Sequence, residues 1–267
     1  MNFINSLESF QYVPQGMIIG EGKKIGSNED LFFRAKQNEI YDQYCAARIF
    51  MRETEFQVEE KDKYLTSLSE MYKSDLDMGV YLKSIFYESA LIYYNIVVDL
   101  TWVLTYACIE YFCFENQCDI LPLKGIQDVD TARKSLIHIE ENTVSPGSVN
   151  NPFTYLRQIA PAFNCSIDII KQFWDKYCND KIRNRYNYIK HRGKPYYLEV
   201  KDERIFNAYS GSGESFVQLA SAVSDVSERY SLDEAIKDLQ EFDDNCLFEY
   251  VYKLIKELEN IVKPTIV

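Results

Sequence analysis

The most apolar region of the chain, residues 91 to 114, is interrupted by Asn95, Asp99 and Glu110. Ten uncharged residues lie between Asp99 and Glu110, whereas a helix that crosses a membrane needs about twenty apolar residues. Polar side chains inside a protein need partners, which the neighbouring helices of a bundle can supply. The region therefore predicts a buried helix of a bundle and not a membrane span.

Helical periodicity covers most of the remaining chain, because apolar residues recur at three- and four-residue spacing. Ser27 followed by Glu29 and Asp30 is a typical helix start, with acids that complement the helix dipole. The capping box from Ser231 to Glu234 is another. We predict helices over about 31–56, 64–72, 76–114 (with one break allowed), from a cap at Ser166 to Gly193, and over 232–261.

Three segments depart from this helical pattern. Residues 1–26 contain Pro14 and four glycines and predict an irregular lead-in. The segment Leu198–Phe206 alternates around an Asp-Glu turn and predicts a small hairpin, and 209–213 predicts a flexible connection.

The expected fold is an all-α helical bundle with N-terminal helices, this small hairpin and a long C-terminal helix. Residues 1–74 form an irregular segment and helices packed on the bundle, and 75–267 form the bundle with its C-terminal extension. We expect the two parts to make one compact unit.

Cysteine usage and the N-terminal sequence indicate a cytoplasmic protein without metal or cofactor. The seven cysteines form no C-x-x-C pair, which fits reduced and mostly packed thiols. The first eight residues lack the basic start and apolar run of a secretory signal. With 46% hydrophobic residues, the chain can build a core without disulfides or metals.

The positive charge of the chain is concentrated in residues 181–194, which hold six cations, one of the two histidines and no acid. The whole chain has 29 Lys+Arg against 41 Asp+Glu, a net charge of −12, and removing the six cations leaves 23 against 41, or −18. A local basic patch on an acidic body attracts phosphate at one place while the remaining surface repels bulk nucleic acid. We therefore expect RNA or a nucleotide at this patch and no binding of DNA.

His191 is placed for proton transfer at the end of the basic helix. Gly193 and Pro195 end that helix, so His191 falls in its last turn, where the carbonyl ends stabilise an imidazolium. Arg185 lies about 120° round the helix and about 9 Å along it, within reach of a shared phosphate.

Polar residues share the stripe of His191. Asn184 and Asn187 or Tyr188 precede it at seven- and four- or three-residue spacing. A cation that neutralises phosphate, a histidine and an orienting Asn are sufficient for RNA cleavage by the neighbouring 2′-hydroxyl. This chemistry requires no metal.

Arg185, five intervening residues and His191 resemble the Arg-x(4–6)-His motif of the HEPN superfamily. The string Arg-Tyr-Asn-Tyr-Ile-Lys-His-Arg-Gly and the acidic helix after Leu232 are similar to a subgroup of bacterial HEPN-like proteins. The resemblance implies a helical bundle, a homodimer with a composite cleft and metal-independent RNase activity of the toxin–antitoxin or phage-defence kind. An antitoxin or another protein is then an expected partner.

Each residue of the basic segment takes a role under this interpretation. Arg185 or Arg183 stabilises phosphate charge, His191 is the acid/base, and Asn184 and Asn187 orient them. The residues expected to bind RNA phosphates are Lys181, Tyr188, Lys190, Arg192 and Lys194.

Two ambiguities concern the motif itself. The family commonly has a polar residue directly after its Arg, but Tyr186 follows Arg185. Arg183 is followed by the polar Asn184, but seven residues separate Arg183 from His191, which is more than the motif allows. Arg133 and His138 also match the motif, but the acids after His138 would repel phosphate.

Structural alternatives accompany each functional assignment. His191 can neutralise the free carbonyls of its own helix end, and the basic run can be a solvated face or pair with acids of a neighbouring helix. Asp99 can orient Arg185 or His191, or form a purely structural pair with an Arg. The alternative function is a non-catalytic interaction or nucleotide-binding module that uses the same basic patch.

Overall fold

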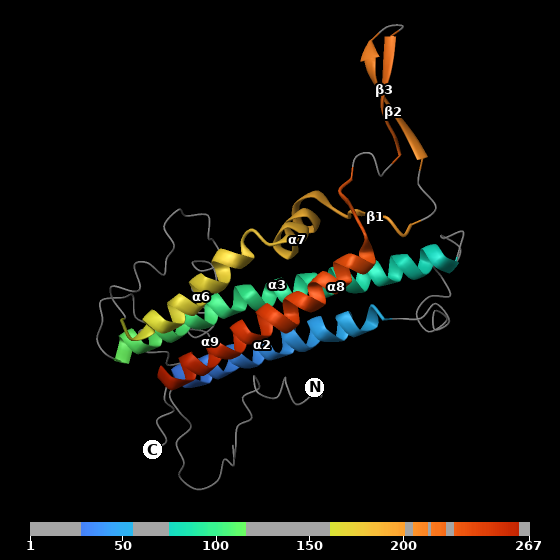
Figure 1. Ribbon diagram of the computed structural model, residues 1–267. Coiled ribbons are helices and arrows are strands. Elements are labelled where there is room, and N and C mark those ends of the chain that lie inside the picture. Colours follow the sequence, from blue (N-terminus) through green and yellow to red (C-terminus); the bar gives the residue numbers. More distant parts are fainter. Residues whose placement is uncertain are drawn as a thin grey trace. The chain divides into compact units, whose positions relative to one another are not determined.

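The computed structural model describes residues 28–55, 75–115, 161–200, 205–212, 215–222 and 227–261. Among the described elements, helices dominate and no sheet is closed, so the all-α fold class is confirmed (Figure 1). None of the described helices combines the length and the apolar character that crossing a membrane would require. The predictions for 1–26 and 64–72, and the motif match at Arg133 and His138, lie outside these residues.

The two long N-terminal helices form as predicted. Helix α2 spans Asn28–Glu53, directly after the polar Ser27. Helix α3 spans Asp75–Glu115 without the break that we allowed. Its apolar middle is buried, and the polar Asn95 within it accepts a hydrogen bond from the Tyr177 hydroxyl.

The helix predicted from Ser166 to Gly193 is two helices, so this prediction was wrong. Helix α6 spans Asn164–Tyr177, after the 3₁₀ turn η2 (Pro161–Phe163), and α7 spans Lys181–Arg192. Asp180 stops the first helix from continuing, because it is extended and its carboxylate caps the second one. Ser166 is not a cap, because it lies buried within α6.

The predicted C-terminal helix is also divided. Helix α8 spans Leu232–Phe242, the π-helical turn η4 spans Asp243–Leu247, and α9 spans Phe248–Ile261. The predicted cap is confirmed, since the Ser231 hydroxyl accepts a hydrogen bond from the Glu234 amide at 3.3 Å. The five-residue step from Phe242 to Leu247 is a π-helical spacing, which keeps both side chains buried.

The hairpin forms later in the chain than predicted. Strand β2 (Ile205–Ser212) pairs antiparallel with β3 (Ser215–Ala222), with a bulge near Ala208. The predicted connection at 209–213 is thus largely strand. Strands β1 (Tyr196–Tyr197) and β4 (Arg229–Tyr230) form a short parallel pair. Leu198, which we expected in the hairpin, follows β1, and its amide donates a hydrogen bond to the Tyr230 carbonyl at 3.2 Å.

The described residues divide into two compact units. Unit 1 takes its residues from Met1–Cys45, Tyr94–Cys178 and Asp244–Val267, and unit 2 from Ala46–Tyr93 and Asn179–Asp243. Helices α2 and α3 contribute residues to both units. The predicted boundary at 74/75 adjoins residues outside the described ranges and stays a prediction.

Unit 1 is held by aromatic packing between helices. Phe173 of α6 stacks on Tyr250 of α9 with ring centroids 3.9 Å apart, and the Tyr250 hydroxyl hydrogen-bonds Thr101 at 2.7 Å. Trp102 of α3 meets Trp174 of α6 edge-on at 5.1 Å. Such ring pairs add to the stabilisation from apolar burial.

Unit 2 contains the basic segment. Its core includes Leu82, Ile182, Tyr186 and Leu239, all buried. Arg48 and Asp243, both nearly enclosed, form an ion pair at 2.7 Å.

Candidate functional site

Helix α7 carries the predicted site, and local interactions set both of its ends. The Asp180 carboxylate accepts a hydrogen bond from the Ile182 amide at 2.7 Å. At the other end, Gly193 has φ +108° and donates its amide to the Tyr188 carbonyl at 3.2 Å. His191 therefore lies in the last turn, as predicted.

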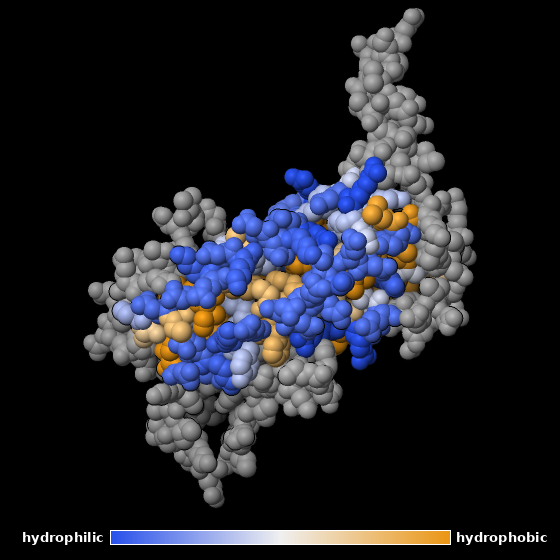
Figure 2. All heavy atoms as spheres, in the orientation of Figure 1, coloured by the Kyte–Doolittle hydropathy of each residue, from blue (hydrophilic) through white to orange (hydrophobic). Residues whose placement is uncertain are grey.

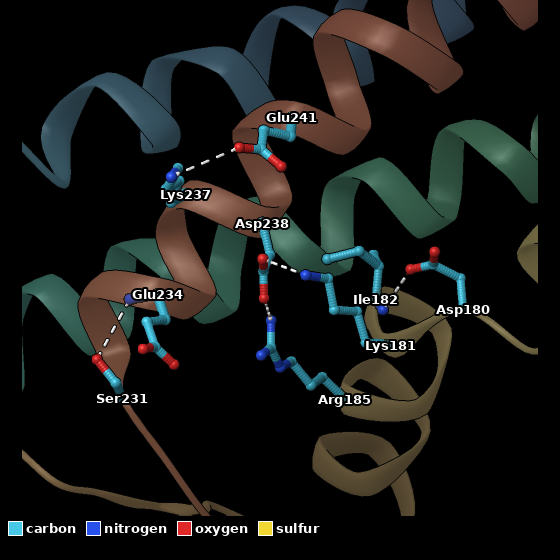
Figure 3. Close-up of polar contacts among 9 residues, drawn as sticks. All are labelled: Asp180, Lys181, Ile182, Arg185, Ser231, Glu234, Lys237, Asp238 and Glu241. Carbon is cyan, nitrogen blue, oxygen red and sulfur yellow. Dashed lines mark hydrogen bonds and ion pairs between the residues drawn. The ribbon is translucent and has the colours of Figure 1, made fainter.

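Arg185 lies on the packed side of α7 and is bonded to an acid. Its Nη1 donates a hydrogen bond to Oδ2 of Asp238 on α8 at 2.8 Å, and Lys181 bonds Oδ1 of the same carboxylate (Figure 3). The side chains of Arg185 and Asp238 are only 12% and 16% exposed. This geometry bears out the alternative in which the basic run pairs with acids of a neighbouring helix, for these two cations.

Asp238 is held in its charged form by these contacts. Burial alone would raise the pKa of its carboxyl, but the hydrogen bonds from Lys181 and Arg185 outweigh that effect, and the pKa lies below its ordinary value. The pair therefore remains ionised in neutral solution.

The buried Tyr87 and the half-buried Tyr230 lie near the Arg185 guanidinium. The Arg185 guanidinium carbon lies 4.9 Å from the centroid of the Tyr230 ring, a cation–π arrangement. Tyr87 is fully buried, and burial raises the pKa of its hydroxyl while nearby Arg185 opposes that increase. Burial likewise raises the pKa of Tyr230, so both hydroxyls stay neutral.

Lys194, which we predicted to bind phosphate, forms an ion pair and a hydrogen bond with residues of α3. Its Nζ lies 3.0 Å from the Glu88 carboxylate and donates to the Ser84 hydroxyl at 2.7 Å. Glu88 also accepts a hydrogen bond from the buried Tyr197 hydroxyl at 2.7 Å. Burial, followed by the charge of Glu88, raises the pKa of Tyr197.

The outward side of α7 presents the other predicted residues. Asn184, Lys190, His191 and Arg192 are exposed, and the surface over α7 is hydrophilic in Figure 2. Within the described part of the chain, the side chains of His191 and Arg192 make no hydrogen bond, ion pair or ring contact. They are therefore accessible to an incoming ligand.

Arg183 and Lys190 lie against one ring on this side. Their charged groups are 5.3 Å and 5.6 Å from the centroid of Tyr186, which is buried beneath them. Asn187 is half-buried. The Tyr188 hydroxyl accepts a hydrogen bond from the Glu228 amide at 3.0 Å, which ties it to the segment before β4.

The structure thus separates the two motif residues: Arg185 is bonded inside unit 2 and His191 faces solvent. Asp99 belongs to unit 1, so its predicted role in orienting either of them stays a prediction. The sequence analysis did not identify Asp238 or Glu88 as partners. The acidic character of the C-terminal helix was a signal for Asp238, whereas Glu88 lies in α3.

Within the described ranges, no group of three or more His, Cys, Asp or Glu side chains is arranged to hold a metal ion. Comparisons of the chain with models of known families, with curated proteins and with solved structures found no match. The resemblance to HEPN proteins accordingly stays an expectation that rests on the motif.

Proposed function

We propose that the protein is a HEPN-like, RNA-binding, metal-independent endoribonuclease that acts on single-stranded or loop RNA. The observation that supports this proposal is the accessible turn Lys190–Arg192, in which His191 is flanked by two cations at a helix end. Cations beside a proton-transfer group suit a phosphodiester whose charge increases in the transition state.

The proposed reaction uses the 2′-hydroxyl of the RNA as the nucleophile. This hydroxyl loses its proton as its oxygen attacks the adjacent phosphorus, the bond from phosphorus to the 5′ oxygen breaks, and that oxygen gains a proton. The products end in a 2′,3′-cyclic phosphate and a 5′-hydroxyl. His191 carries the proton to or from one of these oxygens.

A homodimer completes this proposal. One chain offers one His191 at the site, whereas the reaction uses a base and an acid. A two-fold dimer that brings two α7 helices to a shared cleft supplies both. As in toxin–antitoxin systems, a protein partner would then block the cleft.

The test is a cleavage assay with purified protein on structured and unstructured RNAs, with and without EDTA. We expect cleavage that EDTA leaves unchanged, and 2′,3′-cyclic phosphate ends in the products. If the protein binds RNA but leaves every RNA class intact, the nuclease proposal is wrong.

One observation favours a second candidate, a non-catalytic interaction module. Lys181, Arg185 and Lys194 are already paired with acids of the same chain, so part of the basic segment is structural. In that case the outward face of α7 docks an acidic protein or a nucleotide. Binding of such a ligand without RNA cleavage would favour this candidate.

A further inference from the structure

Two cations of α7 bind one carboxylate of α8, and this contact holds one side of α7 against α8. Lys181 and Arg185 are one helical turn apart, and both reach Asp238. Arg185 is largely enclosed, whereas Lys181 is exposed, but each is bonded to this acid and would have to leave it before it could take a phosphate.

Asp238 is itself fixed by a firmly anchored helix. The Glu199 carboxylate accepts hydrogen bonds from the Ser231 hydroxyl at 2.6 Å and from the Leu232 amide at 2.9 Å, at the start of α8. Leu232, Ala235 and Leu239 of α8 are buried. The Arg185–Asp238 bond therefore joins α7 to a capped helix with a buried face.

The cations in the last turn of α7 are exposed and are not bonded to an acid in the described residues. Lys190 and Arg192 are exposed and flank His191 in the sequence. Arg192 has no partner within the described residues, and Lys190 lies over the Tyr186 ring, a contact that leaves its ammonium open to water on one side.

We infer that the cations of this helix are divided between two tasks: Asp238 makes Arg185 and Lys181 positioning residues, and Lys190 and Arg192 bind phosphate beside His191. The inference rests on the proposed function, and it assigns the phosphate contacts to cations other than the motif arginine. In this assignment Arg185 does not contact the ligand. Its bond to Asp238 orients α7 so that the exposed side of the helix faces the ligand.

The chain offers matched variants for the test. Lys190→Gln and Lys181→Gln each remove one lysine charge from an exposed position of α7, and Arg192→Gln and Arg185→Gln each remove one arginine charge. The probe is a fluorescent 2′-O-methyl RNA 12-mer, which cannot be cleaved by 2′-hydroxyl attack, with its affinity measured over a range of salt concentrations.

We expect Lys190→Gln and Arg192→Gln each to reduce the log–log salt slope by about 0.7, the value for one phosphate contact of a single strand. Lys181→Gln and Arg185→Gln should leave the slope unchanged. Equal losses from Lys181→Gln and Lys190→Gln, or failure of the wild type to bind the 12-mer, would overturn the inference.

Arginine labelling of the unmodified protein with phenylglyoxal gives a second measurement, which is independent of whether Arg185→Gln folds. Arg192, which is exposed, should react faster than Arg185, which is enclosed and bonded to Asp238, and the 12-mer should protect Arg192. Labelling of Arg185 as fast as Arg192 would overturn the inference. Absence of cleavage with binding intact would instead reject only the nuclease proposal.

Discussion

Arg185 and Asp238 are bonded across two helices, with 2.8 Å between the guanidinium Nη1 and the carboxylate Oδ2. The two residues are 53 positions apart in the chain. Their contact places the arginine of the HEPN-like motif on the packed side of α7 and leaves His191 on the accessible side. A substitution that breaks the Arg185–Asp238 contact should therefore change stability, whereas a substitution of His191 should change activity.

Asp238→Asn should lower the free energy of unfolding at pH 7 by about 1.5–3 kcal/mol, the range for hydrogen bonds to charged groups. The pKa of Asp238 is lowered in the folded protein, so its stabilisation is present above the unfolded pKa of about 3.9 and is lost as the pH falls through the folded value. Chemical denaturation of both proteins from pH 7 to pH 2 should show the difference shrinking. Glu241→Gln, an exposed acid on the same helix, is the control.

His191→Ala should lower RNA cleavage about 10²- to 10⁴-fold, the usual contribution of a general acid or base. Thermal stability and RNA binding should change little, because the side chain is exposed and has no partner within the described residues. Cleavage rates, melting curves and affinity are measured together. His138→Ala should behave as the wild type, and full activity of His191→Ala would contradict the assignment.

Glu199→Gln should destabilise the protein by about 1 kcal/mol, as expected for loss of a helix cap. Burial would raise the pKa of Glu199, but its hydrogen bonds to Ser231 and the first amides of α8 outweigh that effect and lower it. The carboxylate form is therefore the stabilising one, and melting temperatures at pH 7 should show the loss. Glu249→Gln, an exposed acid of α9, should have no such effect.

Gly193→Ala should destabilise the protein by about 1–3 kcal/mol even though an added Cβ meets nothing within 4 Å. The cost arises from the backbone, because φ +108° is a conformation that residues with a side chain rarely adopt. Denaturant unfolding measures it. An unchanged free energy would mean that α7 ends differently in solution.

Light scattering at micromolar concentration should give the mass of two chains, about twice 31.3 kDa. The reason is the proposed composite cleft, which needs a second His191. A stable monomer that still cleaves RNA would show that one chain is sufficient, and it would remove the two-fold cleft from the mechanism.

Local features of the fold could be predicted because their signals span only a few residues. The Ser231 cap depends on a residue three positions away, and the place of His191 in the last turn depends on Gly193. The long helices α2 and α3 follow from periodicity sustained over many turns. The prediction missed the break before α7, although the buried Tyr177 and Ile182 on either side of Asp180 are five positions apart, more than the three or four of one helical face.

The helical class, the concentration of positive charge in one segment and the place of His191 near a helix end could all be predicted from the amino-acid sequence, since each depends on composition or on neighbouring residues. Which cations remain accessible depends on helix packing, because Asp238 of α8 pairs with Arg185 of α7, and Glu88 of α3 pairs with Lys194 just after α7. The register of the β2–β3 hairpin was likewise decided by pairing between segments. A one-dimensional pattern shows that cations are present, but pairing with an acid elsewhere in the chain depends on how the helices pack.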